Sequence, residues 1–168
     1  MRYKCPGYIH NWCGHDISCF TTWSSNRNPV DVFQLLELLI KKFDIVGLQT
    51  GVLKVSTIGD CYLATSELPD IQYDHAEVMA KFLVECQKIF EVVTTELLYT
   101  LGSETTDLKL WCSSYSGPVT AGVLRGLRSR FEIFGDTVNT ESCMESTGIP
   151  TIIQISRATT DLLIKSRK

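Results

Sequence analysis

Apolar side chains recur at helical spacing in two long segments of this chain. The first segment follows Asn28-Pro29, a pair typical of a helix start because proline is tolerated in the first turn. The second runs from about Asp74 to Leu101 and stops before Gly102, a residue type that commonly ends helices. Both segments are predicted to be amphipathic helices whose apolar stripes face a core. The stripes consist of Val32, Leu36, Leu39, Ile40 and Phe43 in the first helix and of Met79, Phe82, Leu83, Cys86, Ile89, Phe90, Val93 and Leu97 in the second.

Shorter β-type segments, separated by turn residues, are predicted around these helices. The first, Tyr8 to Asp16, is interrupted by asparagine, glycine and histidine and is poor in β-branched residues. The segments Val52 to Thr57 and Cys61 to Thr65 are joined at Gly59-Asp60, a tight hairpin signal. The remaining predicted elements are strands at Leu108–Ser114 and Val119–Leu124 around the turn Ser116-Gly117-Pro118, a hairpin near Arg125–Phe134, a helix from Thr137, a strand at Ile152–Ile155 and a helix from about Ala158.

The order of these elements indicates the fold class. Strand, helix, strand, strand, helix, strand is the order of a ferredoxin-like βαββαβ core, and the later strands and helices would be additions at its C-terminal end. The sequence therefore predicts an α+β fold. A chain of 168 residues is expected to form a single domain, residues 1–168.

Charge and composition narrow the classes of partner. Sixteen basic and nineteen acidic residues give a net charge of −3, which offers no general attraction to nucleic acid or to an anionic membrane. The longest strongly apolar run, Val32 to Ile40, is about half as long as a membrane span requires. We therefore expect no nucleic acid partner and no membrane contact by the chain itself. Seven cysteines, an odd number without a repeating framework, are typical of reduced thiols in an intracellular protein.

Two aspartates are candidates for binding a divalent cation. Asp16 would end the first strand, and Asp60 lies in the turn between the second and third strands. Because the first strand lies beside the third in a ferredoxin-like sheet, both carboxylates would converge at one end of it. Adjacent carboxylates repel each other unless a cation lies between them, and magnesium binds one or two carboxylates together with water and phosphate oxygens. Backbone N–H groups in a following turn could hold those phosphates, and the turn residues would be Ile17, Ser18, Cys19 and Phe20.

Spacing alone leaves other interpretations open. Asp60 could be a turn residue chosen for its backbone preference, and Asp16 could be a cap or loop residue. Zinc is not favoured as an alternative, because the cysteines and histidines near the N-terminus form no Cys-x-x-Cys unit. Those residues are Cys5, His10, Cys13, His15 and Cys19.

Three motifs resemble those of the class III nucleotide cyclases. They are Asp16-Ile-Ser-Cys-Phe-Thr21, Lys54-Val-Ser-Thr-Ile-Gly-Asp60 and Arg130-Phe-Glu-Ile-Phe-Gly-Asp-Thr-Val-Asn-Thr-Glu-Ser-Cys-Met-Glu-Ser-Thr-Gly148. The resemblance covers roughly residues 14–165. Receptor-type guanylate cyclases of algae and diatoms are especially similar in the segments Asp74-His-Ala, Met79-Ala-Lys-Phe82 and Ser116-Gly-Pro-Val-Thr-Ala-Gly-Val-Leu-Arg-Gly126. The resemblance implies a ferredoxin-like core, two Mg²⁺ or Mn²⁺ ions bound by the two aspartates, and the conversion of GTP or ATP to a 3′,5′-cyclic nucleotide and pyrophosphate.

The resemblance also implies the other half of the site, since members of this family work as head-to-tail dimers with each site built across the interface. Asn139 matches an asparagine that orients the ribose, and Cys143 stands where the family has an arginine that stabilises charge on the phosphates. Ser56 occupies the position of a glutamate that reads guanine. Glu132 occupies a position that is usually cysteine in guanylate cyclases and aspartate in adenylate cyclases.

Three of these four positions have a plainer interpretation. Asn139 could satisfy backbone donors in the first turn of a helix, and Cys143 could be a small buried thiol. Glu132 could be a solvent-facing strand residue paired with Arg130, or it could accept a hydrogen bond from the amino group of either purine. Ser56 offers only a hydroxyl to the base.

The leading hypothesis is a cyclase domain that acts on GTP, or on ATP as the second choice, in intracellular signalling. It would work in the cytoplasm as a homodimer or as a heterodimer with another cyclase domain, and a parent protein could be anchored in a membrane. The resemblance leaves room for truncation at both ends, because the family continues beyond the position of Lys168. The alternative is a non-catalytic or half-site partner, a regulatory nucleotide-binding domain of a heterodimeric cyclase, because Cys143 supplies no positive charge.

Overall fold

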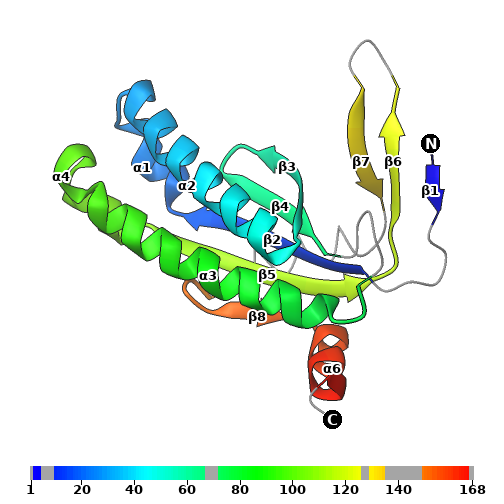
Figure 1. Ribbon diagram of the computed structural model, residues 1–168. Helices are drawn as coiled ribbons and strands as arrows, with labels where there is room; N and C mark the ends of the chain where they lie inside the picture. Colours follow the sequence, from blue (N-terminus) through cyan, green and yellow to red (C-terminus); the bar gives the residue numbers. More distant parts are fainter. Residues whose placement is uncertain (1, 5–9, 67–71, 126–128, 135–148, 167–168) are drawn as a thin grey trace.

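Two β-sheets and a layer of helices make up the chain in its computed structural model, which describes residues 2–4, 10–66, 72–125, 129–134 and 149–166 (Figure 1). The larger sheet contains β2 (His10–Ser18), β3 (Leu53–Ile58), β4 (Cys61–Thr65), β5 (Lys109–Gly117) and β8 (Ile153–Ile155). Its strand order is β3-β4-β2-β5-β8, antiparallel throughout except for the parallel pair β5 and β8. Strand β2 thus lies at the centre of the sheet.

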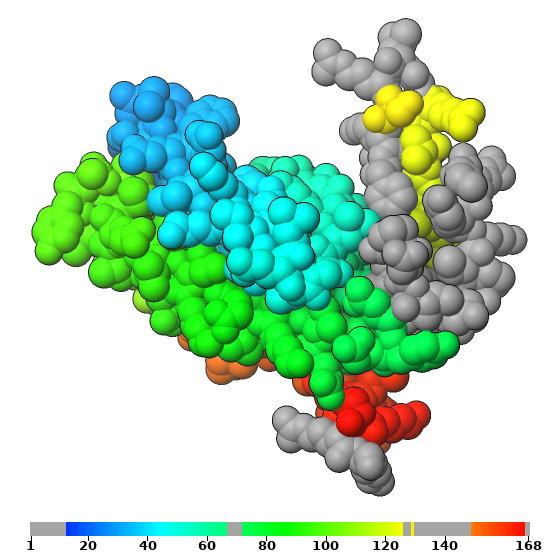
Figure 2. Space-filling view, in the orientation of Figure 1, coloured from blue at the N-terminus to red at the C-terminus, as the bar shows by residue number. Residues whose placement is uncertain are grey.

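The two long helices are α2 (Pro29–Thr50) and α3 (His75–Glu96), and both cover the same face of the larger sheet (Figures 1 and 2). The order β2-α2-β3-β4-α3-β5, with β2 beside β4, confirms the predicted ferredoxin-like core. Among the described residues no helix has both the length and the apolar character needed to cross a membrane. The shorter helices are α1 (Phe20–Ser25), α4 (Leu98–Leu101), the 3₁₀ helix η1 (Ser103–Asp107) and α6 (Arg157–Ser166).

The smaller sheet stands away from the two long helices (Figure 1). It contains β1 (Arg2–Lys4), β6 (Thr120–Leu124) and β7 (Arg130–Phe134), in the order β1-β6-β7. Strand β5 continues to Gly117 and β6 begins at Thr120, so the predicted turn marks the passage of the chain from one sheet to the other. The two strands around that turn are therefore not partners in a hairpin.

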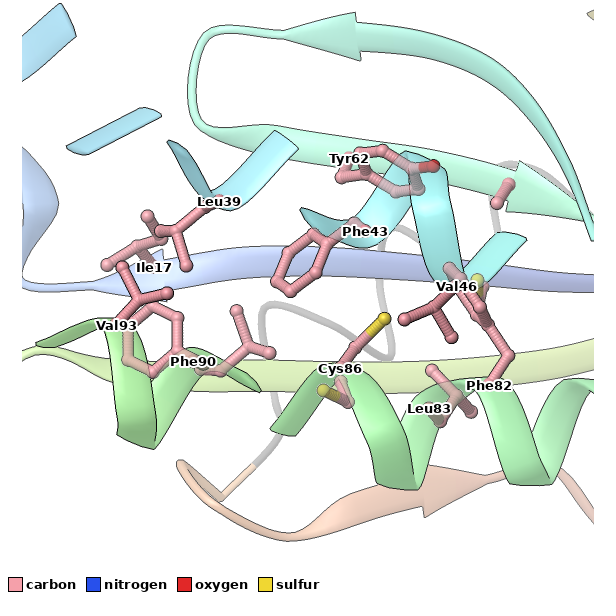
Figure 3. Packing of buried hydrophobic residues seen from close by; sticks show 14 of the residues in the cluster. Ile17, Leu39, Phe43, Val46, Tyr62, Phe82, Leu83, Cys86, Phe90 and Val93 are labelled. Carbon is pink, nitrogen blue, oxygen red and sulfur yellow. The ribbon is translucent and has the colours of Figure 1, made fainter. Parts of the chain in front are cut away.

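The hydrophobic core lies between the larger sheet and the helices α2 and α3 (Figure 3). The stripe predicted on the second helix is confirmed, because all of its members are buried except Ile89, which is partly buried. On α2 the predicted stripe also packs on the core, since Leu39 and Phe43 are buried and Val32, Leu36 and Ile40 are partly buried against it. The prediction missed Leu35 and Val46, which are buried as well. Apolar residues also occupy the outer side of this helix, where Phe33 is 71% exposed, and they blur the sequence pattern.

Several elements differ from the prediction. Strand β2 runs on to Ser18 because its pairing with β5 continues to Lys109, the first residue of β5. Helix α1 was not predicted, because a segment of six residues with a single buried side chain, Trp23, has no readable period. The second long helix ends at Glu96, and a separate turn, α4, follows. The predicted helix from Thr137 and part of the hairpin near Arg125 lie outside the described residues.

We expect the substitution Phe82→Ala to lower the free energy of unfolding by about 3–5 kcal/mol, because this fully buried ring fills the centre of the core. The matched substitution Phe33→Ala should change it by less than about 0.5 kcal/mol, because that ring is largely exposed. Urea unfolding followed by circular dichroism measures both. Equal losses in the two variants would contradict the core described above.

Candidate active site

Strand β2 places successive side chains on opposite faces of the larger sheet. His15 lies opposite Tyr62, and its ring centroid is 5.5 Å from that of Phe43 and 5.6 Å from that of Phe82. His15 therefore faces the long helices. Asp16, the next residue, belongs to the other face, which is turned away from α2 and α3 and is called the far face below.

The His15 imidazole is part of the core. Burial lowers the pKa of His15 to about 4, and the nearby Tyr62 backbone offsets only part of that effect. The ring is therefore neutral at physiological pH and packs as one more aromatic group. This explains how a strand with histidine beside an aspartate can lie at the centre of the sheet.

Asp60 reaches the end of β2 from the turn that joins β3 and β4. Gly59 adopts a positive φ of 64° in this turn, and Asp60 follows it. One Asp60 carboxylate oxygen, Oδ2, accepts a hydrogen bond of 3.3 Å from the backbone N–H of Ile17. The structure thus brings Asp60 beside Asp16, as the strand order predicted.

The two carboxylates perturb each other. Burial, a hydrogen bond with Asp60 and repulsion from the Asp60 charge raise the pKa of Asp16 to about 6, while the N–H of Ile17 offsets a small part of this rise. Two acidic groups in contact and partly withdrawn from water are costly to ionise together unless positive charge lies near them. A cation bound beside the pair would therefore stabilise the ionised form of both carboxylates.

The donor set fits Mg²⁺ or Mn²⁺. Both cations accept carboxylate oxygens, and Mg²⁺ usually keeps several waters while it binds one or two carboxylates and substrate phosphates. Among the described residues no cluster of three or more His, Cys, Asp or Glu could hold a metal by itself. Two carboxylates would leave the remaining coordination positions to water and to phosphate oxygens. Metal binding by Asp16 and Asp60 stays a prediction that this geometry allows.

The first half of the segment predicted to hold phosphates is strand rather than turn. Ile17 and Ser18 are the last residues of β2, opposite Leu110 and Lys109, so the turn prediction is wrong for these two. The Ser18 hydroxyl also accepts a hydrogen bond of 3.1 Å from the Lys109 backbone N–H. The chain turns only at Cys19.

Cys19 and Phe20 form the link from β2 to α1. Cys19 is exposed and has a φ of 62°, in the left-handed region that non-glycine residues seldom adopt. Phe20 begins α1 and stacks on Trp23, with ring centroids 6.1 Å apart. The predicted contact of this link with phosphates stays a prediction.

Ser56 lies on the far face together with Asp16. It is paired with Leu63 of β4, and Leu63 is paired with Gly14 of β2. Residues directly opposite each other in a sheet share a face, and Gly14 is two residues from Asp16 along the same strand. The structure therefore places the candidate base residue on the same face as the candidate metal ligands.

Sequence reasoning missed Trp111 as a neighbour of this site. Trp111 is directly opposite Asp16 in the pairing of β2 and β5, so the two share the far face. Its indole nitrogen is buried and has no hydrogen-bond partner among the described residues. Strand alternation along residues 109–117 would have revealed it, because Leu110 and Cys112 are the buried apolar positions and Trp111 lies between them.

The remaining candidates are described only in part. Glu132 lies in β7 with its backbone opposite Gly122 of β6, in the smaller sheet, and its side chain is outside what the structure describes. Asn139 and Cys143 lie outside the described residues altogether. Their predicted roles toward ribose and phosphate stay predictions.

Most of the chain resembles known proteins. Residues 14–168 match the family model of the adenylate and guanylate cyclase catalytic domain. A receptor-type guanylate cyclase of Caenorhabditis elegans, gcy-28, is 39% identical over 150 residues, which are 89% of this chain and 11% of that protein. The chain thus spans about a tenth of the length of this curated relative.

Solved structures give the same result. The dimeric guanylyl cyclase domain of the RhoGC fusion protein from the aquatic fungus Blastocladiella emersonii has a TM-score of 0.82 and 34% identity, over 94% of this chain and 84% of that one. The guanylate cyclase domain of RhGC from Catenaria anguillulae, solved in complex with GTP, has a TM-score of 0.80 and 33% identity, over 93% of this chain and 82% of that one.

We expect the free energy of unfolding of the metal-free chain to depend on pH through the ionisation of Asp16. Its folded-state pKa of about 6 lies above the ordinary value of 3.8, so between these pH values the folded state binds more protons than the unfolded state. The contribution of Asp16 to the free energy of unfolding therefore falls as pH rises from about 4 to about 6. Urea unfolding in a chelator, compared between the native chain and Asp16→Asn, measures it.

The lowered pKa of His15 changes the free energy of unfolding in the opposite direction, because protonation of His15 favours the unfolded chain as pH falls from 6.5 toward 4. For this reason the difference between the native chain and Asp16→Asn, rather than the native curve alone, carries the Asp16 signal. Parallel stability curves for the two proteins across pH 4–6 would contradict the carboxylate interaction.

Proposed function

Because the chain belongs to the family of adenylate and guanylate cyclase catalytic domains, we propose that it converts GTP, and less readily ATP, to a 3′,5′-cyclic nucleotide and pyrophosphate. The observation that carries the proposal is the Asp16–Asp60 carboxylate pair on the far face. The GTP complex of the related domain from Catenaria anguillulae supports GTP as the substrate class.

Asp16 and Asp60 would hold two Mg²⁺ or Mn²⁺ ions, which when bound neutralise phosphate charge and favour ionisation of the ribose 3′-hydroxyl. The half-buried position of the pair keeps bulk water partly away, which strengthens electrostatic contacts with the substrate. The backbone at Cys19 and Phe20 would lie beside the phosphates. The exposed position of Cys19, directly after the strand that carries Asp16, supports this placement.

The reaction is an in-line displacement within one molecule. The ribose 3′-oxygen loses its proton and forms a bond to the α-phosphorus, and the bond from that phosphorus to the oxygen leading to the β-phosphorus breaks, so pyrophosphate leaves. The protein contributes mainly by positioning these atoms and stabilising charge. Asn139 would orient the ribose, and Ser56 and Glu132 would line the base pocket.

We further propose that the domain works as a homodimer or as a heterodimer with another cyclase domain, on the cytoplasmic side of a parent protein anchored in a membrane. The RhoGC domain, which was solved as a non-canonical dimer, supports the pairing of two such domains. The receptor type of the Caenorhabditis elegans relative supports the membrane-anchored parent. In such a dimer the partner's Asn139 position would complete the site that this subunit's aspartates begin.

We expect the purified chain with Mn²⁺ to form cyclic GMP from GTP faster than cyclic AMP from ATP, measured by mass spectrometry of the products. The substitution Asp60→Ala should lower the rate by about 10²-fold or more, because one of two metal-binding carboxylates is lost. A rate unchanged by Asp60→Ala, with its fold confirmed by circular dichroism, would refute the assignment of the carboxylate pair.

A second candidate function follows from Cys143, which lacks the charge and the forked donors of the family arginine. The chain would then be the metal-binding half of a heterodimeric site, or a regulatory domain that only binds nucleotide. In a homodimer the arginine would be missing from both sites.

For the half-site function we expect the native chain alone to be almost inactive and Cys143→Arg to raise its rate by about 10²- to 10³-fold, because a single charge-stabilising donor contributes that much. A subunit with an intact arginine should raise the rate in the same way when mixed with the native chain. Full activity of the native chain alone would exclude the half-site function. Nucleotide binding without turnover in every mixture would favour the regulatory domain.

A further inference from the structure

The outer side of helix α2 carries a row of exposed residues that the site described above does not use. Figure 2 shows this helix uncovered at the surface, coloured blue to cyan. Among the apolar members of the row, Leu48 is 86% exposed, Phe33 71% and Val30 69%. Large apolar side chains gathered on one exposed helix face indicate a contact surface. We call the row the outer stripe, and it consists of Val30, Phe33, Glu37, Lys41, Ile45 and Leu48.

Shallow hollows flank the outer stripe on both sides of the helix. Leu38 lines one of them, and Leu36 and Ile40 line the other. Phe33 and Lys41 border both hollows. A ridge with a hollow on each side is a surface on which another helix can pack, because side chains of one helix enter the grooves of the other. The shape of the outer stripe therefore fits a helical occupant.

The outer stripe is symmetric about its midpoint, position 39. Two charged residues come first on either side of that position, and two pairs of apolar residues follow at equal distances from it. Leu39 itself is buried against the core on the opposite side of the helix. A twofold axis placed opposite Leu39 would therefore pass through the centre of the stripe. The pairs equally far from position 39 are Glu37 and Lys41, Phe33 and Ile45, and Val30 and Leu48.

Two copies of α2 packed antiparallel about this axis would bring matching side chains together. Glu37 of each copy would face Lys41 of the other, and each apolar residue of the stripe would face an apolar residue. A contact of this isologous kind forms every pair twice. A parallel packing in the same register would instead set each charge against its own copy, which is repulsive. Charge and apolar pattern therefore both favour the antiparallel arrangement.

We infer that the outer stripe is a self-association surface, and that its occupant is a second copy of this chain packed antiparallel on α2. This inference goes beyond the proposed function and does not depend on it. Helix α2 covers the face of the larger sheet opposite the far face, so the contact leaves Asp16 and Asp60 accessible to a different partner. A domain with two different interfaces of this kind would join head-to-tail dimers into larger assemblies.

The contact is small, so free chains should associate weakly. The strip that faces the second copy is about 27 Å long from Val30 to Leu48 and about 10 Å wide, from the rise and diameter of a helix. Its area is well below the roughly 800 Å² that each partner buries in a stable complex. Weak contacts of this kind gain strength when the copies are held close together. The proposed anchoring of a parent protein in a membrane would supply that condition.

The test reverses the two charges separately and measures association by sedimentation equilibrium. Glu37→Lys leaves only positive charge at the centre of the stripe and Lys41→Glu leaves only negative charge, so each variant repels its own copy. We expect each variant to lower the association constant about tenfold. An equimolar mixture of the two variants should associate as strongly as the native chain, because unlike charges then meet at both places. No effect within a single chain can produce this recovery.

Two further comparisons separate this surface from general effects of charge and folding. Glu85→Lys and Lys88→Glu reverse an ion pair of 2.7 Å on the exposed side of α3, and neither these variants nor their mixture should change the association constant. Phe33→Ala should lower it about tenfold, because each ring is lost from two equivalent contacts. Circular dichroism checks that every variant keeps its fold.

The outcomes distinguish this inference from the proposed function. Equal association of the native chain, the Glu37 and Lys41 variants and their mixture would overturn the inference but leave a head-to-tail dimer through the far face standing. A mixture as weak as its components would overturn the antiparallel pairing and the inference with it. A native chain that stays monomeric up to about 1 mM would also overturn it, and would point to another segment of a longer parent protein as the occupant.

Discussion

The double pairing of β2 is the constraint on which the rest of this structure depends. The strand is hydrogen-bonded to β4 on one side and to β5 on the other, so its backbone has no freedom to rotate. Alternation then assigns His15 to the core and Asp16 to the far face. A shift of one residue would bury the carboxylate among the aromatic rings and expose the histidine, which no rearrangement of side chains could repair.

How much the sequence predicts depends on how local the signal is. The stripe on α3 is legible because its period is set within the helix, and the approach of Asp60 to Asp16 follows from a topological rule that needs only the order of elements. His15 made β2 a poor strand in the sequence, because the aromatic neighbours that bury its ring come from α2, α3 and β4 and cannot be read from the strand itself.

What the sequence could not predict arises between elements. The bulge at Val55 is visible only as a mismatch in the pairing of β3 with β4, and the position of Trp111 opposite Asp16 is visible only in the pairing of β5 with β2. Ile17 and Ser18 were expected in a turn because the first strand was expected to end at Asp16, whereas the pairing with β5 extends the strand to Ser18. In each case a partner strand, distant in sequence, overrides the local preference.

The smaller sheet has a consequence for the order in which the chain can fold during its synthesis. Residues 2–4 pair with residues 120–122, and the central strand β2 needs β5, which ends at Gly117. A ribosome delivers the earlier strands first, so β1 and one edge of β2 stay without their partners until residues 109–124 have emerged. Until then only β4, already made by residue 65, is available to β2. The strand that organises the finished domain is thus, on the nascent chain, an open edge for which chaperones and neighbouring chains would compete.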